Sequence, residues 1–201
     1  LFRSMMFEFR DIYDAYLECR RGKRDTANAL MFELDLVDKL YDLETSLKSG
    51  TYRPKRSICF LSNSPKLREI FAADFGDRVV HHLLTPYLQE IFEPRFVYDV
   101  YNNRVGKGIH AASKRAEKFA IANSGGYYLQ LDIRKYYYNI NHNILRNFIS
   151  KKIKDERIVN LIMLFVDTVK GIGLFVGNVL SQLFGLIYLS PLDHFVKRVL
   201  K

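Results

Sequence analysis

The chain has 201 residues, of which 48% are hydrophobic and 26% are charged. This composition excludes a disordered or collagen-like chain, and the length suffices for one domain, or two small lobes, with a buried core. The two cysteines, Cys19 and Cys59, fit no disulfide or metal-site spacing. So few cysteines, together with no evident signal peptide, indicate a reducing compartment and predict a cytoplasmic location.

Positive charge is concentrated in the second half of the chain. The 31 Lys and Arg exceed the 22 Asp and Glu, which gives a net charge of +9. Residues 1–100 carry 15 basic and 16 acidic residues, whereas residues 101–201 carry 16 basic and 6 acidic residues. A basic half on a globular chain indicates a polyanionic partner, most simply nucleic acid, although a merely soluble basic protein has the same composition.

Hydrophobic periodicity predicts more helices than strands, with the strands scattered among the helices. This order is typical of an α+β fold rather than of a regularly alternating α/β fold. The predicted helices are 7–20, 28–48, 77–92, 108–122, 144–153, 156–169 and a long helix that begins after Asn178 and is kinked or broken at Pro191. The predicted strands are 57–61 and 67–72, which form a hairpin, a buried strand at 127–133, and a strand or hairpin at 171–176.

Two local features bear on the organisation of the chain. Gly50 stands where a glycine ends the 28–48 helix. Residues 171–192 contain no charge and are long enough to span a bilayer, but their glycines, polar residues and Pro191 predict a buried core segment and no membrane association. The chain begins with Leu1 and ends at Lys201 inside a predicted helix, so we expect it to be a piece of a longer reading frame.

Asp132 is the residue that most strongly suggests chemistry. It stands at the end of the predicted strand 127–133, and carboxylate oxygens are the ligands that Mg²⁺ prefers. A lone aspartate at a strand end more often caps a turn, so the residues around it decide. The sequence LDIRKYYYNINH resembles the first catalytic-aspartate motif of reverse transcriptases. The matching residues are Asp132, Tyr136, Tyr137, Ile140 and His142.

Other segments resemble further reverse transcriptase motifs in the order of that family. Residues 66–70 with 77–80 resemble the fingers motif that holds the triphosphate, and residues 101–110 resemble the following basic, glycine-containing motif. Residues 173–182 resemble a palm motif, and the helix that follows it matches as well. The resemblance implies a right-hand polymerase with an N-terminal helical segment at 1–56, fingers at 57–126 and a partial palm at 127–201.

The resemblance also implies roles for individual residues. Two-metal nucleotidyl transfer would use Mg²⁺, or Mn²⁺, held by Asp132 and the backbone of Ile133. Lys66 and Arg68 would neutralise the triphosphate, unless they form a solvated strand face. Tyr137 would exclude a ribose 2′-hydroxyl. Val176 and Gln182 would border the templating base pair. Arg104 and Lys107 would contact nucleic acid.

The palm motif indicates the subfamily. Most reverse transcriptases carry Gln before the central Gly and end the motif in Ser-Pro, whereas this chain has Val176 before Gly177 and ends in Ser181-Gln182. This is similar to reverse transcriptases of diversity-generating retroelements, which make error-prone cDNA from an RNA template. The implied partners are template RNA, primer, dNTPs and a basic accessory protein. Plain core packing is the alternative role of Val176.

Several features depart from the family pattern. Phe175 and Leu180 stand where members usually have Pro and Thr, and the chain contains neither a Tyr-x-Asp-Asp motif nor any Asp-Asp pair. The chain alone is therefore expected to be inactive. Two alternatives stay open: a retron or group II intron-like reverse transcriptase, and a non-catalytic RNA-binding module with the same fold. The run of Lys151, Lys152 and Lys154 favours a solvated face over a phosphate track.

Overall fold

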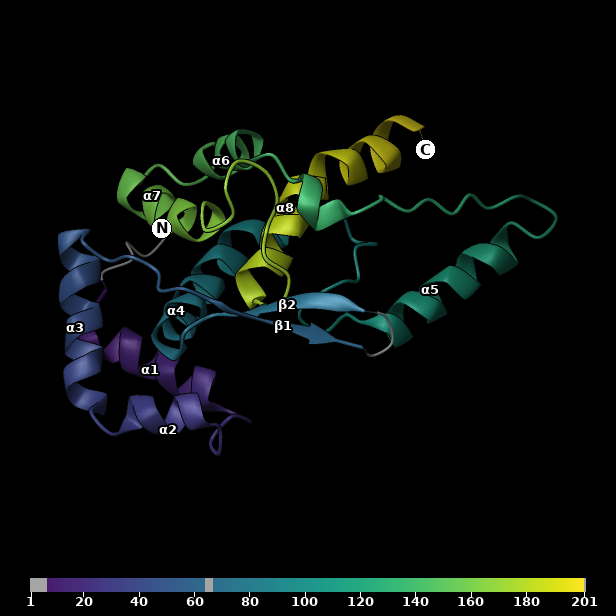
Figure 1. The fold of residues 1–201 in the computed structure, drawn as a ribbon. Coiled ribbons are helices and arrows are strands. Elements are labelled where there is room, and N and C mark those ends of the chain that lie inside the picture. The colour runs from purple at the N-terminus through teal and green to yellow at the C-terminus, as the bar shows by residue number, and fades with distance from the viewer. Residues whose placement is uncertain (1–6, 64–66, 201) are drawn as a thin grey trace.

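The computed structural model describes residues 7–63 and 67–200, and it is a mixed structure of helices and one small sheet (Figure 1). This confirms the α+β class. In chain order the elements are α1 (Phe9–Arg20), α2 (Ala27–Glu33), α3 (Leu36–Ser49), β1 (Ile58–Ser62), β2 (Arg68–Ala72), α4 (Phe75–Phe92), η1 (Glu93–Arg95), α5 (Ile109–Ala122), η2 (Tyr136–Asn139), α6 (His142–Ser150), α7 (Glu156–Val166), α8 (Val179–Phe195) and the π-helical turn η3 (Val196–Leu200).

Helix α4 lies at the centre of the hydrophobic core. It packs against α1, α2 and α8, while α6 packs against α7 and α8. Buried side chains from the predicted N-terminal, fingers and palm segments join one continuous hydrophobic cluster among the described residues. The divisions at residues 56 and 126 therefore stay predictions drawn from the motifs, because the core does not separate there.

The predicted hairpin is confirmed. Strands β1 and β2 pair antiparallel, with Ile58 opposite Ala72 and Ser62 opposite Arg68. They form the sheet of the described part of the chain, and the connection between them includes residues 64–66, which lie outside it. The hairpin therefore places Arg68 at the end of β2 nearest the connection.

The predicted helix 28–48 is wrong as a single element, because the chain bends at residues 34 and 35. Lys39 Nζ, from α3, lies 2.6 Å from the carbonyl oxygen of Met31 and so stabilises the open end of α2. The bend lets Phe32 pack on Phe75, with ring centroids 5.0 Å apart. Gly50 does end α3, in the left-handed conformation with φ of 71°.

The end of the chain forms a long helix, α8, continued by η3. The side chain of Asn178 accepts a hydrogen bond from the backbone N–H of Ser181, at 2.7 Å, as an N-terminal cap. Pro191 lies inside α8 and does not end it. The helix Val179–Leu200 is long and apolar enough to cross a membrane, and 39% of its most apolar window is buried in the protein. A core helix has the same length and composition.

Helix α5 and the segment that follows it extend away from the core (Figure 1). No residue of α5 is buried. The helix is joined to the rest of the protein through Arg115, whose Nε lies 2.8 Å from Asp99 Oδ1. Residues 123–135 then run outward and return toward α8 (Figure 1).

Candidate active site

The segment after Asp132 lies beside residues 171–178, the loop before α8 that begins the predicted palm motif and is called the palm loop below. Asn141 and Ile172 form an isolated antiparallel bridge. The backbone N–H of Gly173 donates to Ile140 O at 2.8 Å, and that of Leu174 donates to Tyr137 O at 2.8 Å. The predicted strand or hairpin at 171–176 is thus a loop that pairs with residues 137–141. The fold brings two motifs together that lie more than thirty residues apart in the sequence.

Gly173 permits this close approach. Its φ is +100°, and a Cβ atom placed on it would lie 3.1 Å from Tyr138 O and 3.2 Å from Tyr138 Cα. Both neighbours are backbone atoms, which cannot move aside as the end of a flexible side chain can. A residue without a side chain is therefore required at this position.

Replacing Gly173 with alanine is expected to destabilise the protein by more than about 1 kcal/mol, because backbone strain adds to the steric clash. For a chain of this size that is a loss of roughly 2–4 °C or more in Tm, measurable by thermal unfolding. Gly171→Ala is the matched control, since Gly171 has φ of +83° but nothing within 4 Å of a Cβ. Equal losses in the two variants would contradict the proposed clash.

His142 fixes the same loop from the other side. His142 is 6% exposed, with Nε2 2.7 Å from Gly173 O and Nδ1 2.9 Å from Asp167 Oδ1. Both ring nitrogens are within hydrogen-bond distance of oxygen atoms, one of the palm loop and one of the segment after α7. The sequence identified His142 as part of a motif but gave no sign of Asp167 as its partner. The arrangement makes His142 a positioning residue for the loop.

Tyr136 and Tyr137 hold η2 against α8. The Tyr136 hydroxyl donates to Gly185 O at 2.6 Å, and the two rings meet edge to face with centroids 5.4 Å apart. A Cβ on Gly185 would lie 3.2 Å from Tyr137 Cε1, so the helix presents bare backbone to the ring. Burial raises the pKa of Tyr137 above its usual value. Tyr137 is therefore half-buried and held by α8.

The other end of the palm loop packs on β2. The backbone N–H of Phe71 donates to Val176 O at 3.0 Å, and the Phe71 and Phe175 rings stack with centroids 4.0 Å apart. Gly177, with φ of +126°, comes so close to Ile70 that a Cβ would lie 2.9 Å from Ile70 Cγ2. The fold thus places Val176 beside the strand that carries Arg68.

The predicted substrate residues fall into three groups. Tyr137 in η2 and Val176 in the palm loop are half-buried. Gln182 in the first turns of α8 and Arg68 on β2 are exposed. Lys66 lies outside the described residues. The loop 171–178 therefore connects the elements that carry four of the predicted contacts.

Asp132 and Ile133 are not part of this cluster. The predicted buried strand at 127–133 is wrong: these residues form an exposed, irregular segment with no strand pairing. The physical reason is that a strand is buried only between partners, and the described residues supply no strand other than β1 and β2. The Asp132 carboxylate has no hydrogen bond or ion pair with any described residue.

The described residues do not by themselves form a cation site. They contain no group of three or more His, Cys, Asp and Glu side chains that could hold a metal ion. Around Asp132 they offer one carboxylate and the carbonyl of Ile133, whereas a hard divalent cation takes about six oxygen ligands, waters included. Asp132 can contribute one ligand to such a site but does not constitute it.

Arg104 and Lys107 are held by contacts within the protein. The Arg104 side chain is 9% exposed, and its Nε lies 2.7 Å from Glu93 Oε1. Its Nη1 donates to Val97 O at 2.8 Å. Lys107 Nζ donates to the Tyr98 carbonyl and lies 3.8 Å from the centroid of the Tyr98 ring, and burial lowers its pKa. These contacts give both cations a structural role in the loop after η1.

Asp77 is a buried group whose position the sequence did not reveal. The sequence places Asp77 at the start of a predicted helix, but α4 begins at Phe75 and Asp74 is its N-terminal cap. Asp77 is 3% exposed and accepts hydrogen bonds from the Tyr52 hydroxyl at 2.5 Å and the Lys55 N–H at 2.9 Å. Burial raises the pKa of Asp77 to about 6. The carboxyl group thus ties the segment after α3 to α4.

Asp77→Asn is expected to change how stability depends on pH. The folded pKa lies above the unfolded value of 3.8, so the contribution of Asp77 is fully present near pH 4 and is lost as the pH rises through 6. That shift corresponds to about 3 kcal/mol. The free energy of unfolding of the variant, relative to the parent, should therefore rise between pH 4 and 7 in urea titrations.

The free energy of unfolding must be compared between variant and parent, because His81 changes stability with pH in the direction opposite to Asp77. Burial lowers the pKa of His81 to about 3, so its contribution is lost as the pH falls from 6.5 toward 3. Both proteins retain His81, and its effect cancels in the difference. A difference that stays constant over this pH range would contradict the shifted pKa of Asp77.

Comparison with known proteins supports the reverse transcriptase motifs at the level of the family. The chain is 30% identical to the Group II intron-encoded protein LtrA of Lactococcus lactis subsp. cremoris over 175 residues, which are 79% of this chain and 28% of that protein. It is 27% identical to an uncharacterized 91 kDa protein in the cob intron of Schizosaccharomyces pombe, and 25% identical to the protein YkfC of Escherichia coli. These matches cover 88% and 86% of this chain and 22% and 49% of those proteins, respectively. No protein-family model matches the chain.

The chain therefore spans less than half the length of each of these curated relatives. One of these proteins is encoded by a group II intron and another lies in the cob intron, and the similarity supports a relationship to reverse transcriptases in general. Activity, substrates and partners are properties of the whole protein, and for this chain they are proposals.

Proposed function

We propose that the chain is the fingers and first palm segment of an RNA-directed DNA polymerase. The observation that carries the proposal is the pairing of residues 137–141, which follow Asp132, with the loop 171–177. Two motifs of one catalytic family are far apart in sequence and adjacent in the fold. The similarity to LtrA supports the same conclusion from an independent direction.

In this function the residues of the chain position a nucleotide between β2 and α8. Arg68 on β2 is exposed and suited to contact phosphate oxygens, with Lys66 beside it in sequence. Tyr137 stands against α8 as a rigid wall for the sugar, and Val176 and Gln182 border the base pair. A divalent cation, Mg²⁺ or Mn²⁺, bound with the help of Asp132 and the Ile133 carbonyl would neutralise developing phosphate charge.

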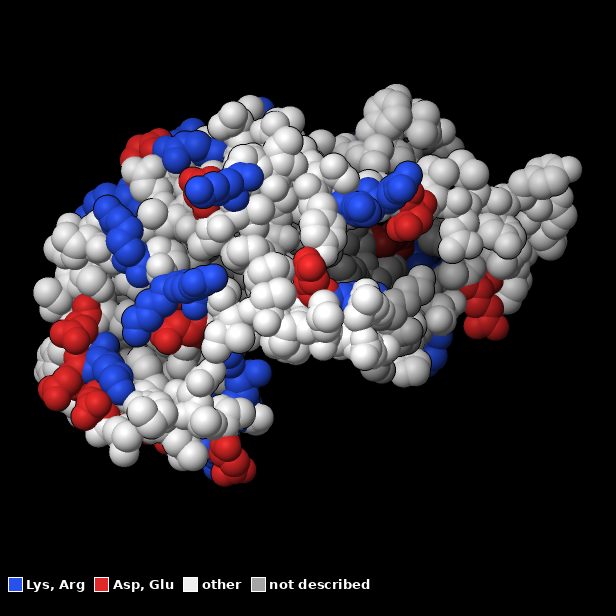
Figure 2. Space-filling model, viewed as in Figure 1, with Lys and Arg blue, Asp and Glu red and all other residues white. Residues whose placement is uncertain are grey.

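The partners that fit this function are template RNA, primer and dNTPs. A basic accessory protein and a cytoplasmic location belong to the same proposal. Lys and Arg side chains are spread over several elements of the face in Figure 2, with Asp and Glu among them over the N-terminal helices. Net positive charge on this scale favours association with nucleic acid through phosphate contacts.

Two types of reverse transcriptase remain as candidates, and they differ in the fidelity with which they copy a template. Val176 and Ser181-Gln182 favour an error-prone enzyme of the diversity-generating type, whereas the similarity to LtrA favours a group II intron type. An apolar Val176 packs against a nucleotide but cannot fix its position by a hydrogen bond. We propose the error-prone type, because it accounts for Val176.

Primer extension on an RNA template by the full-length protein, followed by sequencing of the cDNA, tests both levels. Extension that requires dNTPs and a divalent cation supports the polymerase, whereas RNA binding without extension supports a non-catalytic module. Val176→Gln is expected to lower misincorporation opposite template adenine by roughly tenfold, since one well-placed polar contact can contribute about 1.4 kcal/mol to discrimination. An active variant with an unchanged error rate would refute the error-prone assignment.

A further inference from the structure

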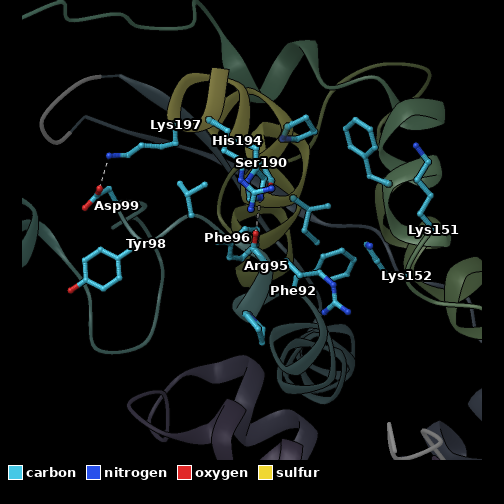
Figure 3. A pocket seen from close by; sticks show the side chains of 16 residues that line it. Phe92, Arg95, Phe96, Tyr98, Asp99, Lys151, Lys152, Ser190, His194 and Lys197 are labelled. Atoms are coloured by element: carbon cyan, nitrogen blue, oxygen red, sulfur yellow. Dashed lines mark hydrogen bonds and ion pairs between the residues drawn. The ribbon is translucent and has the colours of Figure 1, made fainter. Parts of the chain in front are cut away.

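A pocket lined by basic residues lies at the end of α8 opposite the palm loop. The pocket has a volume of about 990 Å³ and is bounded by the loop at 92–99, the end of α6 and the last turns of α8 with η3 (Figure 3). None of its lining residues belongs to the segments 127–137 or 171–182, which carry most of the candidate active site. His194 joins two of its walls, because Nε2 lies 2.8 Å from Arg95 O.

The charge of this pocket is strongly unbalanced. Five of its lining residues are cationic, and Asp99 is its one acidic residue. Asp99 is already paired twice, with Lys197 Nζ at 2.6 Å and Arg115 Nε at 2.8 Å. In the described part of the chain, Lys151, Lys152 and Arg198 form no ion pair. The pocket therefore holds cations without counterions, which is an arrangement that favours a polyanion.

The three lysines for which the sequence favoured a solvated face do not share one environment in the structure. Lys151 and Lys152 line the pocket, and Figure 3 shows them on the side opposite Lys197. Lys154 does not line it, and its Nζ bonds to Ser150 O at 3.2 Å. Two neighbouring lysines thus face a common cavity, while the third lies on the surface outside it.

Aromatic side chains accompany the cations. Tyr98 lines the pocket and is 70% exposed, and Phe148 lies beside Lys151, whose Nζ is 5.8 Å from its ring centroid. Proteins that bind single-stranded nucleic acid combine a positively charged groove with exposed aromatic rings on which bases stack. An acidic protein surface would need the cations but not an exposed ring.

We propose that this pocket binds single-stranded nucleic acid, with Lys151 and Lys152 at phosphates and Tyr98 against a base. The site is a second nucleic-acid contact, separate from the site around the palm loop, and it does not require polymerase activity. It would hold a template or an unpaired RNA strand against the body of the protein while the other end of α8 borders the nucleotide.

Binding of a fluorescein-labelled 12-nucleotide oligouridylate to the full-length protein tests the proposal, by fluorescence anisotropy in the absence of dNTPs. The double variant Lys151→Glu/Lys152→Glu is expected to bind roughly tenfold more weakly, with a log–log salt slope smaller by about 1.4. Lys154→Glu is the control for one charge reversal on the same segment outside the pocket, and it is compared with the single variants Lys151→Glu and Lys152→Glu, which change the net charge equally. Circular dichroism establishes that each variant is folded.

A second variant distinguishes nucleic acid from an acidic protein. Tyr98→Ala should weaken oligouridylate binding at least about fivefold but leave binding of a labelled polyglutamate peptide unchanged. Unchanged oligouridylate affinity in the double variant, or an equal loss in Lys154→Glu, would overturn the proposal. So would a Tyr98→Ala variant that binds RNA normally while polyglutamate binding depends on the lysines. Because no extension is measured, failure of the polymerase assay leaves this result standing.

Discussion

Replacing Asp132 with asparagine in the full-length protein is expected to abolish primer extension while leaving nucleic-acid binding nearly unchanged. Asparagine keeps the shape of the side chain but removes the negative charge that a divalent cation requires. The loss should be at least about 100-fold in kcat, which corresponds to about 3 kcal/mol of transition-state stabilisation. Asp132 is exposed and has no partner among the described residues, so the substitution breaks no contact of the described fold.

Primer-extension and filter-binding assays on the same preparations separate catalysis from binding. Glu117→Gln is the matched control, because Glu117 is an exposed carboxylate on the neighbouring helix α5 and its loss changes the net charge equally. Extension at the normal rate by Asp132→Asn would remove Asp132 from the proposed cation site. An equal loss in Glu117→Gln would show that surface charge, and not a ligand, is responsible.

Local signals in the sequence predicted those parts of the fold that depend on neighbouring residues. The left-handed Gly50 ends α3, and Asn178 begins α8 through its side-chain cap, as their positions indicate. The helix predicted at 28–48 failed because apolar spacing continues across residues 34 and 35, while tertiary packing of Phe32 on Phe75 favours a bend. Periodicity reports which residues are apolar but not which partner each one meets.

The predicted strand at 127–133 failed for a related reason. Its apolar residues indicate burial, but a strand also needs neighbours, and residues 127–133 have none among the residues described. Within the site, the fold places the segment after Asp132 against residues 172–174, at the start of the predicted palm motif. The contacts of His142 with Gly173 and Asp167 were not predictable, because they join residues 25 or more positions apart that carry no joint pattern.

The fold shows which partners individual cations meet. The resemblance implies a nucleic-acid contact for Arg104, and the structure shows its donors bonded to Glu93 and to backbone carbonyls. Lys151 and Lys152 are exposed, as a solvated face predicts, and the fold also places them along a pocket with few acids. A sequence gives the number of cations, whereas only the fold shows which of them lack a partner.

If the proposed polymerase function holds, Tyr137→Ala is expected to admit ribonucleotides to the active site of the full-length protein. The ring is held in place by backbone that Gly185 leaves bare and by the edge-to-face contact with Tyr136, so it forms a rigid wall that cannot turn away from a 2′-hydroxyl. Removing it should lower the ratio of kcat/KM for dNTP over NTP by about tenfold or more, since steric exclusion of one group is worth about 1–3 kcal/mol.

Tyr137→Phe is the control, because it keeps the aromatic ring, both as a steric barrier to the 2′-hydroxyl and as a packing contact with α8. The hydroxyl of Tyr137 makes no hydrogen bond with any described residue, so phenylalanine keeps the ring and its contact with α8. The Phe variant should retain the parent's selectivity and stability, while the Ala variant loses selectivity and also some stability through the cavity left beside Gly185. Single-nucleotide insertion kinetics with dNTP and NTP measure the ratio directly. If Tyr137→Ala loses stability but discriminates as the parent does, Tyr137 is only a packing residue of the η2–α8 contact.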